Sequence, residues 1–562
     1  MSHRENESIL VIGGVACGPK AAARARRRDA GVRITVLEAG KTVSYAACGM
    51  PYYLAGVTDD VTSLQSTPAG AVRDETFFDK VKDIQVRTCT RAISIDRVAK
   101  TVLAIDLNSG EQKAFRYGKL VLATGAVPIV PAIEGTGLKR VLALRHLDDA
   151  EQIRRLIDDM AVDRATIIGG GRIALEVADA MMAQAVDCTI IEMADHLLPT
   201  SLDSEMAGLV ECALRDKGIQ VMPRTQAHRI EGDANGVARK VITEAGEVKT
   251  DLVLVAIGVR PNVELAERAG LELGETGAIA VNEYLQTSDP DIYAGGDCVE
   301  CLHVVTGKPT FAPLGSTANR HGRVIGDNLT GGRTRFSGTA GTGILRTMGL
   351  NVAGTGLTES RAAALGYRAI GGTASGHDRS HFYPGGKTIT VKIVADAGNG
   401  RVLGGQAVGR GDTCRAIDVL ASALTFGASV SQVADLDLAY APPYGGPISS
   451  VSHAANVVRN KMDGLANTMG VAEIRENLAQ GKELLFLDVR GPIEVEKSPF
   501  TLGQVLAIPL GELRSRVGDV PRDKQVVCIC PLGIRAYEAS RMLVAAGLDD
   551  ARFIEGGMVC WS

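Results

Sequence analysis

The sequence predicts an α/β protein with two Rossmann-like dinucleotide-binding folds, followed by two smaller domains. Two observations lead to this prediction. A strand, a glycine-rich turn and a helix recur about 155 residues apart, and in each copy a carboxylate ends the next strand. The length of 562 residues also suits three or four domains of roughly 150 residues each.

The first copy joins the apolar run "SILVIGG" to "VACGPKAAARARRR", which reads as a helix. Gly13 permits the tight turn, and Gly18 lets the helix pack closely on the strand. The helix N-terminus then presents free N–H groups to a pyrophosphate. Glu38 ends the next strand, where its carboxylate can accept both ribose hydroxyls. Val15 replaces the middle glycine of the usual pattern.

The second copy, "ATIIGGGRIALEVA", has Gly169, Gly171 and Ala174 in the spacing G-x-G-x-x-A. Its carboxylate is Glu192, at the end of "CTIIE". An acid at this position repels a 2′-phosphate, which favours NADH over NADPH as the nucleotide.

Matched segments are expected to close the two nucleotide units. "KLVLATGAVP" (119–128) and "DLVLVAIGVRP" (251–261) are both apolar strands that end in glycine, and they supply Ala123, Gly125 and Gly258 as candidate nucleotide contacts. Asp297 follows the Gly-Gly turn of "IYAGGDC". A carboxylate on such a turn could hydrogen-bond a sugar or ribityl hydroxyl.

Cys48 is the candidate reactive group, in "SYAACGMPYYLAG", ten residues past Glu38. Pro51 suits the first turn of a short helix, whose N-terminus would favour the thiolate. No second cysteine follows within three residues, so Cys48 would form a mixed disulfide with a substrate or be oxidised to a sulfenic acid. Because a flavin relay must sit between hydride donor and sulfur, we expect FAD on the first fold and NADH on the second.

Composition narrows the function classes further. A net charge of −4 shows no basic excess, so nucleic acid is not expected as a partner. No apolar run approaches the ~18 residues of a membrane span, and the polar start "MSHRENES" does not resemble a signal peptide, so a cytoplasmic protein is expected. The odd number of 11 cysteines favours thiols over a disulfide framework, and no metal site is expected.

Residues 9 to about 460 resemble the single-cysteine flavoprotein disulfide reductases, which include coenzyme A-disulfide reductase, NADH oxidase, NADH peroxidase and NAD-dependent persulfide reductase. The motifs that carry the resemblance are "VIGGVACG", "SYAACGMPYYL", "LVLATGAVP", "IIGGGRIALEVA", "IYAGGDC" and "PLGSTANRHGRVIGDNL". The resemblance implies an α+β dimerisation domain at 333–460, where "TITVKIVAD" reads as a strand and "RAIDVLASALTFGAS" as an amphipathic helix.

Further motifs point to the coenzyme A branch of this family. "HFYPGG" and "LDLAYAPPY" resemble its dimerisation segments, which implies that Tyr383 and Tyr440 reach the partner's Cys48 across a homodimer. A phenol there could hydrogen-bond the thiolate or protonate a leaving sulfur. The alternative is that both are ordinary interface aromatics.

Three residues align with family positions that contact coenzyme A: Arg24, Arg27 and Ser44. Without the resemblance, the arginine run at 24–28 reads as a solvated helix face. Ala47 departs from the asparagine that the family often has before the cysteine.

Residues 471–562 read as a small α/β domain that resembles a rhodanese, on the motifs "LDVR", C-x-x-G-x-R and "GGMVCW". The strand "QVVCIC" leads into a loop that Cys530 opens and Arg535 closes. Successive N–H groups of this loop can surround the sulfur, which favours a persulfide carrier. "LGQVLAIPL" stands where the family usually has "GHIPGA", and an inactive module is the alternative.

The predicted domains are a discontinuous FAD-binding domain (1–112 and 265–332), an NAD-binding domain with flanking strands (113–264), the dimerisation domain (333–460) and the rhodanese domain (471–562). The sequence predicts an NADH-driven reductase of coenzyme A disulfide, coenzyme A persulfide or polysulfide, small sulfur compounds that Cys48 attacks. The alternatives are an NADH oxidase or peroxidase that cycles Cys48 through sulfenic acid, and a redox sensor that binds NADH without turnover.

Overall fold

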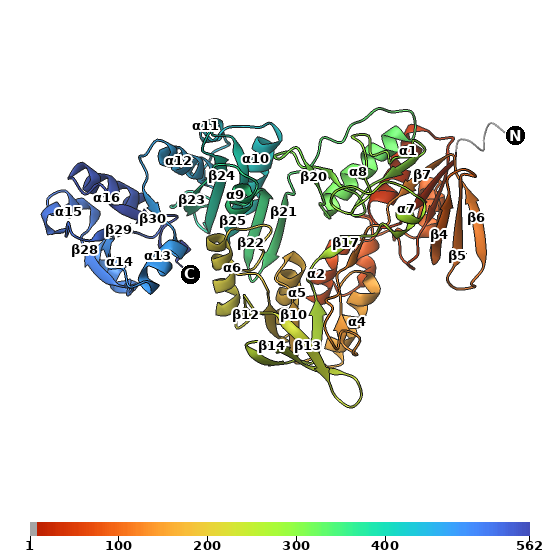
Figure 1. Cartoon of the computed structure of the whole chain (residues 1–562), viewed down its shortest axis with the longest axis horizontal. Coiled ribbons are helices and arrows are strands. Elements are labelled where there is room, and N and C mark those ends of the chain that lie inside the picture. The colour runs from red at the N-terminus through yellow and green to blue at the C-terminus, as the bar shows by residue number, and fades with distance from the viewer. Residues whose placement is uncertain (1–7, 562) are drawn as a thin grey trace. The chain divides into compact units, whose positions relative to one another are not determined.

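The computed structural model describes residues 8–561, so the polar start of the chain, residues 1–7, lies outside the described residues. The chain forms two compact units, one of residues 8–191 with 225–341 and one of residues 192–224 with 342–561 (Figure 1). Within residues 8–561, no helix combines the length and the apolar character needed to cross a membrane.

The first unit opens with a five-stranded parallel sheet. In spatial order its strands are β18 (Ile292–Ala294), β7 (Lys119–Leu122), β1 (Ser8–Ile12), β2 (Arg33–Leu37) and β3 (Gln85–Arg87). Helix α1 (Cys17–Arg28) follows β1 and packs against α8 (Gly315–Asn328). Gly322 and Gly326, one turn apart on α8, permit this contact, since a Cβ on either would lie within 2.7 Å of α1 backbone oxygens.

A second parallel sheet repeats this arrangement. Its strands in the first unit are β11 (Asp187–Ile191), β10 (Arg164–Ile168), β16 (Leu252–Val255) and β9 (Val141–Leu142), in that order. Helix α5 (Arg172–Ala183) follows β10, just as α1 follows β1. The other helices of the unit are α2 (Met50–Leu54), α3 (Glu75–Lys82), α4 (Leu147–Asp158) and α7 (Glu264–Arg268).

Antiparallel strands complete the first unit. One ribbon holds β4 (Thr90–Asp96), β5 (Thr101–Asp106) and β6 (Gln112–Arg116), a second holds β13 (Ala227–Gly232), β14 (Ala238–Thr243) and β15 (Gly246–Lys249), and a short hairpin holds β19 (Cys301–Leu302) and β20 (Pro309–Thr310). Strand β8 (Ala126–Pro128) pairs with β17 (Val259–Pro261), so the two matched segments hydrogen-bond to each other.

Two features of the chain's division differ from the predicted domains. Strand β7 lies in the first sheet, paired with β1, whereas the predicted boundary after residue 112 assigned it to the second domain. Residues 192–224 belong to the second unit, although they fall inside the predicted NAD-binding range. The place of β7 is decided by its long-range pairing with β1, and local sequence patterns do not report such pairing.

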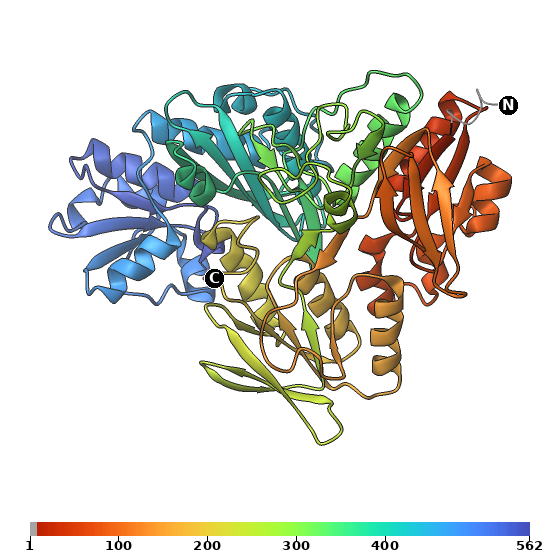
Figure 2. The same cartoon turned by 45° about the vertical axis from the view of Figure 1, so that its right-hand side comes forward.

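The second unit contains a five-stranded antiparallel sheet. Its order is β21 (Gly343–Thr347), β22 (Leu350–Gly356), β25 (Val402–Gly409), β24 (Thr388–Asp396) and β23 (Ala369–His377). Helix α10 (Thr413–Thr425) packs on β22 and β25, and α12 (Ser450–Met462) packs on β23 and β24 (Figure 2). The other elements of this part of the unit are α6 (Ser204–Asp216), β12 (Gln220–Met222), α9 (Glu359–Ala364) and α11 (Val430–Ala434).

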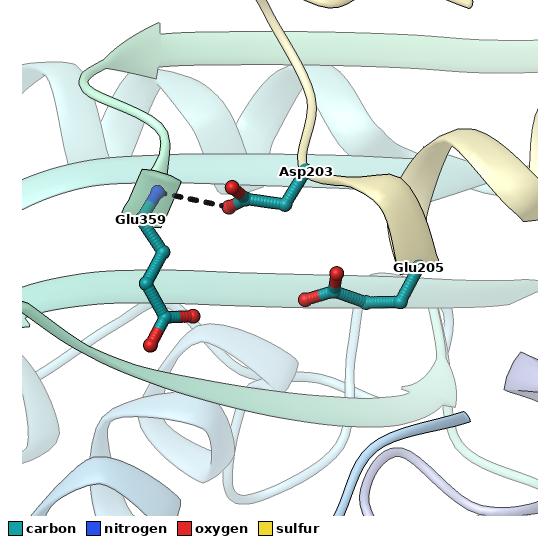
Figure 3. A group of neighbouring side chains, drawn as sticks. All are labelled: Asp203, Glu205 and Glu359. Atoms are coloured by element: carbon teal, nitrogen blue, oxygen red, sulfur yellow. Dashed lines mark hydrogen bonds between the residues drawn. The ribbon is translucent and has the colours of Figure 1, made fainter. Parts of the chain in front are cut away.

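A buried ion cluster holds α6 and α9 to this sheet. Lys392 of β24 is only 3% exposed, and its Nζ lies 3.0 Å from Asp203 Oδ2, 2.7 Å from Glu359 Oε2 and in contact with Glu205. Figure 3 shows the three carboxylates facing one another from the start of α6 and the start of α9. Three such carboxylates could hold a metal ion, but the ammonium of Lys392 already contacts all of them.

The two buried members of the cluster, Lys392 and Asp203, each have several partners, which explains how their charges can be buried. Asp203 also accepts hydrogen bonds from Gln406 Nε2 (2.6 Å) and from the backbone N–H of Glu359 (3.0 Å). Burial alone would raise the pKa of Asp203, yet Lys392 and these donors hold it below its usual value. Burial opposes the charge of Lys392 as well, but the three carboxylates raise its pKa.

The C-terminal part of the second unit is a parallel sheet between two helical layers. The strand order is β26 (Thr468–Met469), β30 (Arg552–Ile554), β29 (Gln525–Ile529), β27 (Leu484–Asp488) and β28 (Gln504–Ala507). Leu485 and Leu487 join a core with α15 (Leu510–Leu513) and α16 (Ile534–Ala545). Leu484 and Phe486 face the other way, toward α13 (Val471–Ala479), and α14 (Pro492–Lys497) follows β27.

We predict that Lys392→Met destabilises the protein by about 3–5 kcal/mol, because it leaves three neighbouring carboxylates without their cation. Urea unfolding at pH 7 would measure the loss, with Lys387→Met, an exposed lysine beside the same strand, as the control. The lowered pKa of Asp203 means that its stabilisation is present above the ordinary carboxyl pKa and is lost as pH falls through the folded value. The gap between wild type and Lys392→Met should therefore shrink as the pH falls below about 4, and a gap that widens would contradict this account.

Candidate active site

Both nucleotide folds have a glycine turn that no other residue could form. Gly13 has φ +109°, and a Cβ on it would lie 2.0 Å from the carbonyl oxygen of Ala123. Gly169 has φ +107°, and a Cβ there would lie 2.5 Å from the carbonyl oxygen of Ala256. Gly18 approaches just as closely, since its Cβ would lie 1.9 Å from Gly13 O. Ala174 is fully buried in α5.

Backbone N–H groups hold a carboxylate beside each turn. The Glu38 carboxylate accepts hydrogen bonds from the backbone N–H of Gly14 (2.6 Å) and Gly40 (2.7 Å), which fixes it beside the first turn. Glu192 directly follows β11 and accepts a hydrogen bond from Ala194 N at 2.7 Å. A Cβ on Gly171 would meet no atom within 4 Å, so that position stays open for a phosphate at the start of α5.

Asp297 and Arg145 form a half-buried polar pair in the first unit. Arg145 Nη2 lies 3.8 Å from Asp297 Oδ2, and Gly125, with φ +71°, would bring a Cβ within 3.0 Å of the same nitrogen. Burial raises the pKa of Asp297, and Arg145 only partly opposes this. Arg145 Nε is buried without a hydrogen-bond partner in the part of the chain that the structure describes. These groups fit a bound flavin nucleotide, whose hydroxyls and ring oxygens could partner them.

Cys48 lies in a short 3-10 turn, Ala47–Gly49, that leads directly into α2 with Pro51 in its first turn. All 11 cysteines fall within the described residues and are free, and among them only Cys48 and Cys414 are exposed. The hydrogen bond from Ala46 N to Leu64 O (2.8 Å) fixes the approach to the turn.

Cys298 and Cys301 are buried and do not resemble a second redox centre. The Cys298 thiol donates to the carbonyls of Leu122 (3.6 Å) and Gly295 (3.4 Å). Burial raises the pKa of Cys298, and it raises the pKa of Cys301 to about 11. Both thiols are therefore neutral packing groups.

Glu176 of α5 is a candidate site residue that sequence reasoning missed. Helix α2 packs against α5, and Tyr52 of α2 hydrogen-bonds the Glu176 side chain. Burial raises the pKa of Glu176 to about 7, although Arg172 opposes the shift. The sequence feature that could have revealed Glu176 is an acid within the apolar stretch "RIALEVA", directly after a nucleotide turn.

Tyr45 and His146 are a second pair that sequence reasoning missed. Tyr45 precedes Cys48 by three residues, and its hydroxyl lies 3.3 Å from His146 Nδ1. Burial, reinforced by Glu38, raises the pKa of Tyr45 to about 12, so it stays a neutral phenol.

The candidate coenzyme A contacts differ in their surroundings. Arg24 Nε lies 2.5 Å from Asp327 Oδ1, so this arginine ties α1 to α8 and is not simply part of a solvated face. Arg27 is exposed, whereas Ser44 is half-buried with φ +54° and donates its N–H to Gly14 O at 2.8 Å.

Tyr383 and Tyr440 lie on neighbouring loops of the second unit. Their side chains are exposed, at 39% and 49%. Ser380 joins the loops, because its N–H donates to Pro442 O (3.1 Å) and its hydroxyl donates to Gly445 O (2.9 Å). The fold therefore brings the two aromatic segments together.

Cys530 lies at the end of β29, within a loop that surrounds its sulfur with donors. Its Sγ accepts hydrogen bonds from the backbone N–H of Gly533 (3.2 Å) and Ala536 (3.3 Å), and Gly533 has φ +91°. Arg535 holds the Glu494 carboxylate with two hydrogen bonds of 2.7 Å, and this contact lowers the pKa of Glu494 to about 2.

Family comparisons match three parts of the chain. Residues 7–319 match the pyridine nucleotide-disulphide oxidoreductase model, residues 347–449 match the dimerisation domain of the same family, and residues 471–562 match the rhodanese-like domain. These matches confirm the predicted fold class and resemblance.

Individual proteins agree with the family models. A solved structure described as a NAD-dependent persulfide reductase from A. fulgidus has 43% sequence identity and a TM-score of 0.94, covering 99% of this chain and 100% of that chain. The NAD(P)H coenzyme A polysulfide/persulfide reductase of Pyrococcus horikoshii is 36% identical over 444 residues, which are 79% of this chain and 96% of that protein.

A relative that is named for a different activity is also similar. The NADH oxidase of Methanocaldococcus jannaschii is 33% identical over 456 residues, which are 81% of this chain and 99% of that protein. Taken with the family matches, these similarities show that the chain belongs to the pyridine nucleotide-disulphide oxidoreductases and carries a rhodanese-like domain at residues 471–562.

Proposed function

We propose that this protein is an FAD-dependent, NADH-driven reductase of S–S bonds in coenzyme A disulfide, coenzyme A persulfide or polysulfide. One observation carries the proposal: a single chain holds an exposed thiol at a helix start, Cys48, and a second thiol within a backbone N–H nest, Cys530. The activities for which the A. fulgidus and P. horikoshii proteins are named support it.

The first fold would hold FAD, which supplies a two-electron relay between the nicotinamide and a thiol when it is bound. The Gly13 turn would face the pyrophosphate, and Glu38 would accept the ribose hydroxyls. Asp297 would accept a ribityl hydroxyl, and Arg145 would donate to the ligand. Ala123 and Gly125 would line the same site, since they follow β7, Ala123 against the Gly13 turn and Gly125 against Arg145.

The second fold would hold NADH. Gly169, Gly171 and Ala174 would bring the start of α5 against the pyrophosphate. Gly258, with φ +123°, would line the site from the end of β16. Glu192 would accept the ribose hydroxyls and repel the 2′-phosphate of NADPH.

At Cys48, the thiolate attacks one sulfur of the substrate and forms a mixed disulfide, while the other half leaves as a thiolate that takes up a proton. Two electrons, derived from NADH, then break the mixed disulfide and restore the Cys48 thiolate. With coenzyme A persulfide, NADH and one proton, the products are coenzyme A, hydrogen sulfide and NAD⁺. With coenzyme A disulfide, they are two coenzyme A molecules and NAD⁺.

Coenzyme A would lie along the start of the first fold in a homodimer. Arg27 and the remaining N–H groups of Arg24 would contact its phosphates, and Ser44 would contact the pantetheine. Tyr383 of the partner subunit and Tyr440 of the partner subunit would donate a hydrogen bond to the Cys48 thiolate or a proton to the leaving sulfur. Each active site would then need both subunits.

Cys530 would carry sulfane sulfur. Its thiolate takes the terminal sulfur of a persulfide, R–S–SH, to give Cys530–S–SH and R–S⁻. The N–H groups of Gly533 and Ala536 would stabilise the charged sulfur, and Arg535 would hold the loop through Glu494. Fusion of the two centres keeps their local concentration high, and coenzyme A would move sulfur between them.

We expect Cys48→Ser to keep its bound flavin but to lose reduction of coenzyme A disulfide and coenzyme A persulfide by about a thousandfold, since the nucleophile is gone. NADH oxidation measured with each substrate tests this, and visible flavin absorbance reports cofactor retention. Cys414→Ser, which alters the other exposed cysteine, should behave as wild type.

The same assays distinguish an NADH oxidase from a reductase of S–S bonds. Oxygen uptake with NADH should be slow beside turnover of coenzyme A persulfide. If oxygen is reduced faster by orders of magnitude, the protein is an NADH oxidase and the proposal is wrong.

Cys530→Ser should leave coenzyme A disulfide reduction unchanged and reduce sulfane transfer to an acceptor thiol by at least about a hundredfold. The reason is that only the second reaction uses the N–H nest. Persulfide formation on the Cys530 peptide, followed by mass spectrometry, measures it directly. Equal transfer by wild type and variant would mean that the rhodanese-like domain is inactive.

Glu176→Gln should remove a pH dependence near neutrality. The raised pKa of about 7 means that the folded protein holds this proton better than the unfolded chain, so Glu176 makes unfolding easier as pH rises from about 4.5 to about 7. The loss should be about 2 kcal/mol, allowing for partial exposure of the group. Urea unfolding at pH 5 and pH 8 should show this slope in wild type and a smaller one in the variant, and parallel slopes would show that Glu176 titrates normally.

A further inference from the structure

Glu555 connects the rhodanese-like domain to the antiparallel sheet of the second unit. Its side chain is 14% exposed, and Oε1 accepts a 2.8 Å hydrogen bond from the backbone N–H of Thr373, on the edge strand β23. Its Oε2 accepts from Lys461 Nζ (3.0 Å), in the last turn of α12, and from Thr468 Oγ1 (2.7 Å). All three donors therefore lie outside residues 471–562, although Thr468 belongs to β26 of the same parallel sheet.

Lys461 strengthens this connection, because its Nζ also donates to Gly371 O of β23 at 2.6 Å. The Glu555 carboxylate and the Lys461 ammonium thus satisfy two backbone groups along the same strand edge. Such groups otherwise remain open on an edge strand, so the docked segment covers that edge.

The residues that follow Glu555 form one wall of the Cys530 loop. Met558 N donates to Cys530 O at 2.9 Å, and Val559 N donates to Pro531 O at 3.1 Å. Gly557 packs so closely that a Cβ would lie 2.5 Å from both Gly533 N and Pro531 O. Gly533 N is one of the two donors to the Cys530 sulfur, so this wall contacts the nest itself.

Cys560 makes a second contact from the same segment to β23. Its Sγ lies 3.8 Å from Ser375 Oγ, and a Cβ on Gly556 would lie 2.5 Å from that sulfur and 3.1 Å from Thr373 Cγ2. Burial raises the pKa of Cys560 to about 12, so it is a neutral packing group. Residues 555–560 are therefore held between β23 and the Cys530 loop.

We propose that Glu555 is a positioning residue: it anchors segment 555–560 to β23 and α12, and that segment holds the Cys530 loop in the shape that stabilises the sulfur anion. The proposal rests on the proposed sulfur-carrying role of Cys530. Glu555 contacts no reacting atom. Strand β23 and helix α12, which lie outside the rhodanese-like domain, thereby support the Cys530 loop by direct contacts. This support adds to any chemistry that links Cys530 with Cys48.

The test uses the full-length protein with two disruptive variants. Glu555→Gln keeps the shape of the side chain but cannot accept from both Thr373 and Lys461, and Lys461→Met removes the donor without altering the rhodanese-like domain. Lys461→Arg keeps a donor and is the rescue variant. The control is Lys524→Met, because Lys524 pairs with Glu483 before β29, at the strand end opposite Cys530.

Two properties of Cys530 would be measured, sulfur transfer from a persulfide donor and the rate of alkylation by iodoacetamide between pH 5 and pH 10, with peptide mapping to isolate Cys530. In both disruptive variants we expect transfer to fall by about tenfold. The midpoint of the alkylation profile should rise by about one pH unit, since weaker N–H donation favours the thiol. Coenzyme A disulfide reduction at Cys48 and the melting temperature should stay near wild type, and Lys461→Arg should restore both Cys530 properties.

Two results would overturn the inference. If both variants keep wild-type transfer and alkylation while Cys530→Ser abolishes transfer, Glu555 does not position the loop. If both reactive centres weaken together with a lower melting temperature, Glu555 only stabilises the fold. Failure of Cys530→Ser to alter transfer would be a different outcome, because it removes the proposed role of Cys530 itself.

Discussion

The second unit depends on the ion pairs that the buried ammonium of Lys392 makes with three carboxylates. This ammonium gathers carboxylates from the start of α6 and the start of α9 onto β24. The α6 segment comes from the middle of the nucleotide-binding sequence, yet it packs with the antiparallel sheet. An arrangement of this kind is costly unless every charge has partners, and Asp203 shows how that is achieved, with a lysine, an amide and backbone N–H groups.

Backbone N–H groups perform the same task at three candidate sites. The turns at Gly13 and Gly169 lead into the N-termini of α1 and α5, which we propose face nucleotides, and the Cys530 loop directs N–H groups at a sulfur. In each case a left-handed glycine makes the close approach possible. Fixed backbone dipoles can stabilise negative charge without a basic side chain, so the net charge of −4 is compatible with the anionic ligands proposed for these sites.

Local patterns in the sequence predicted much of this structure. The run "TITVKIVAD" is strand β24, residue for residue, and Cys48 does precede a short helix with Pro51 in its first turn. The same alternation would place Lys392 on a polar face, but α6 and α9 bury it, and no local pattern reports partners 189 and 33 residues away. For the same reason, local patterns did not reveal the contacts of Glu176 and Glu555 or the place of β7 in the first sheet. Each depends on a contact between segments far apart in the chain.

The pairing of β8 with β17 has a mechanical consequence. The chain passes between the two nucleotide folds twice, and the two passages are hydrogen-bonded side by side over three residue pairs. Twisting one fold against the other would shear this ladder, whereas bending about it needs changes only at its ends, where Gly125 and Gly258 already adopt positive φ. The β8–β17 ribbon thus permits bending of one fold toward the other and resists the other rotations.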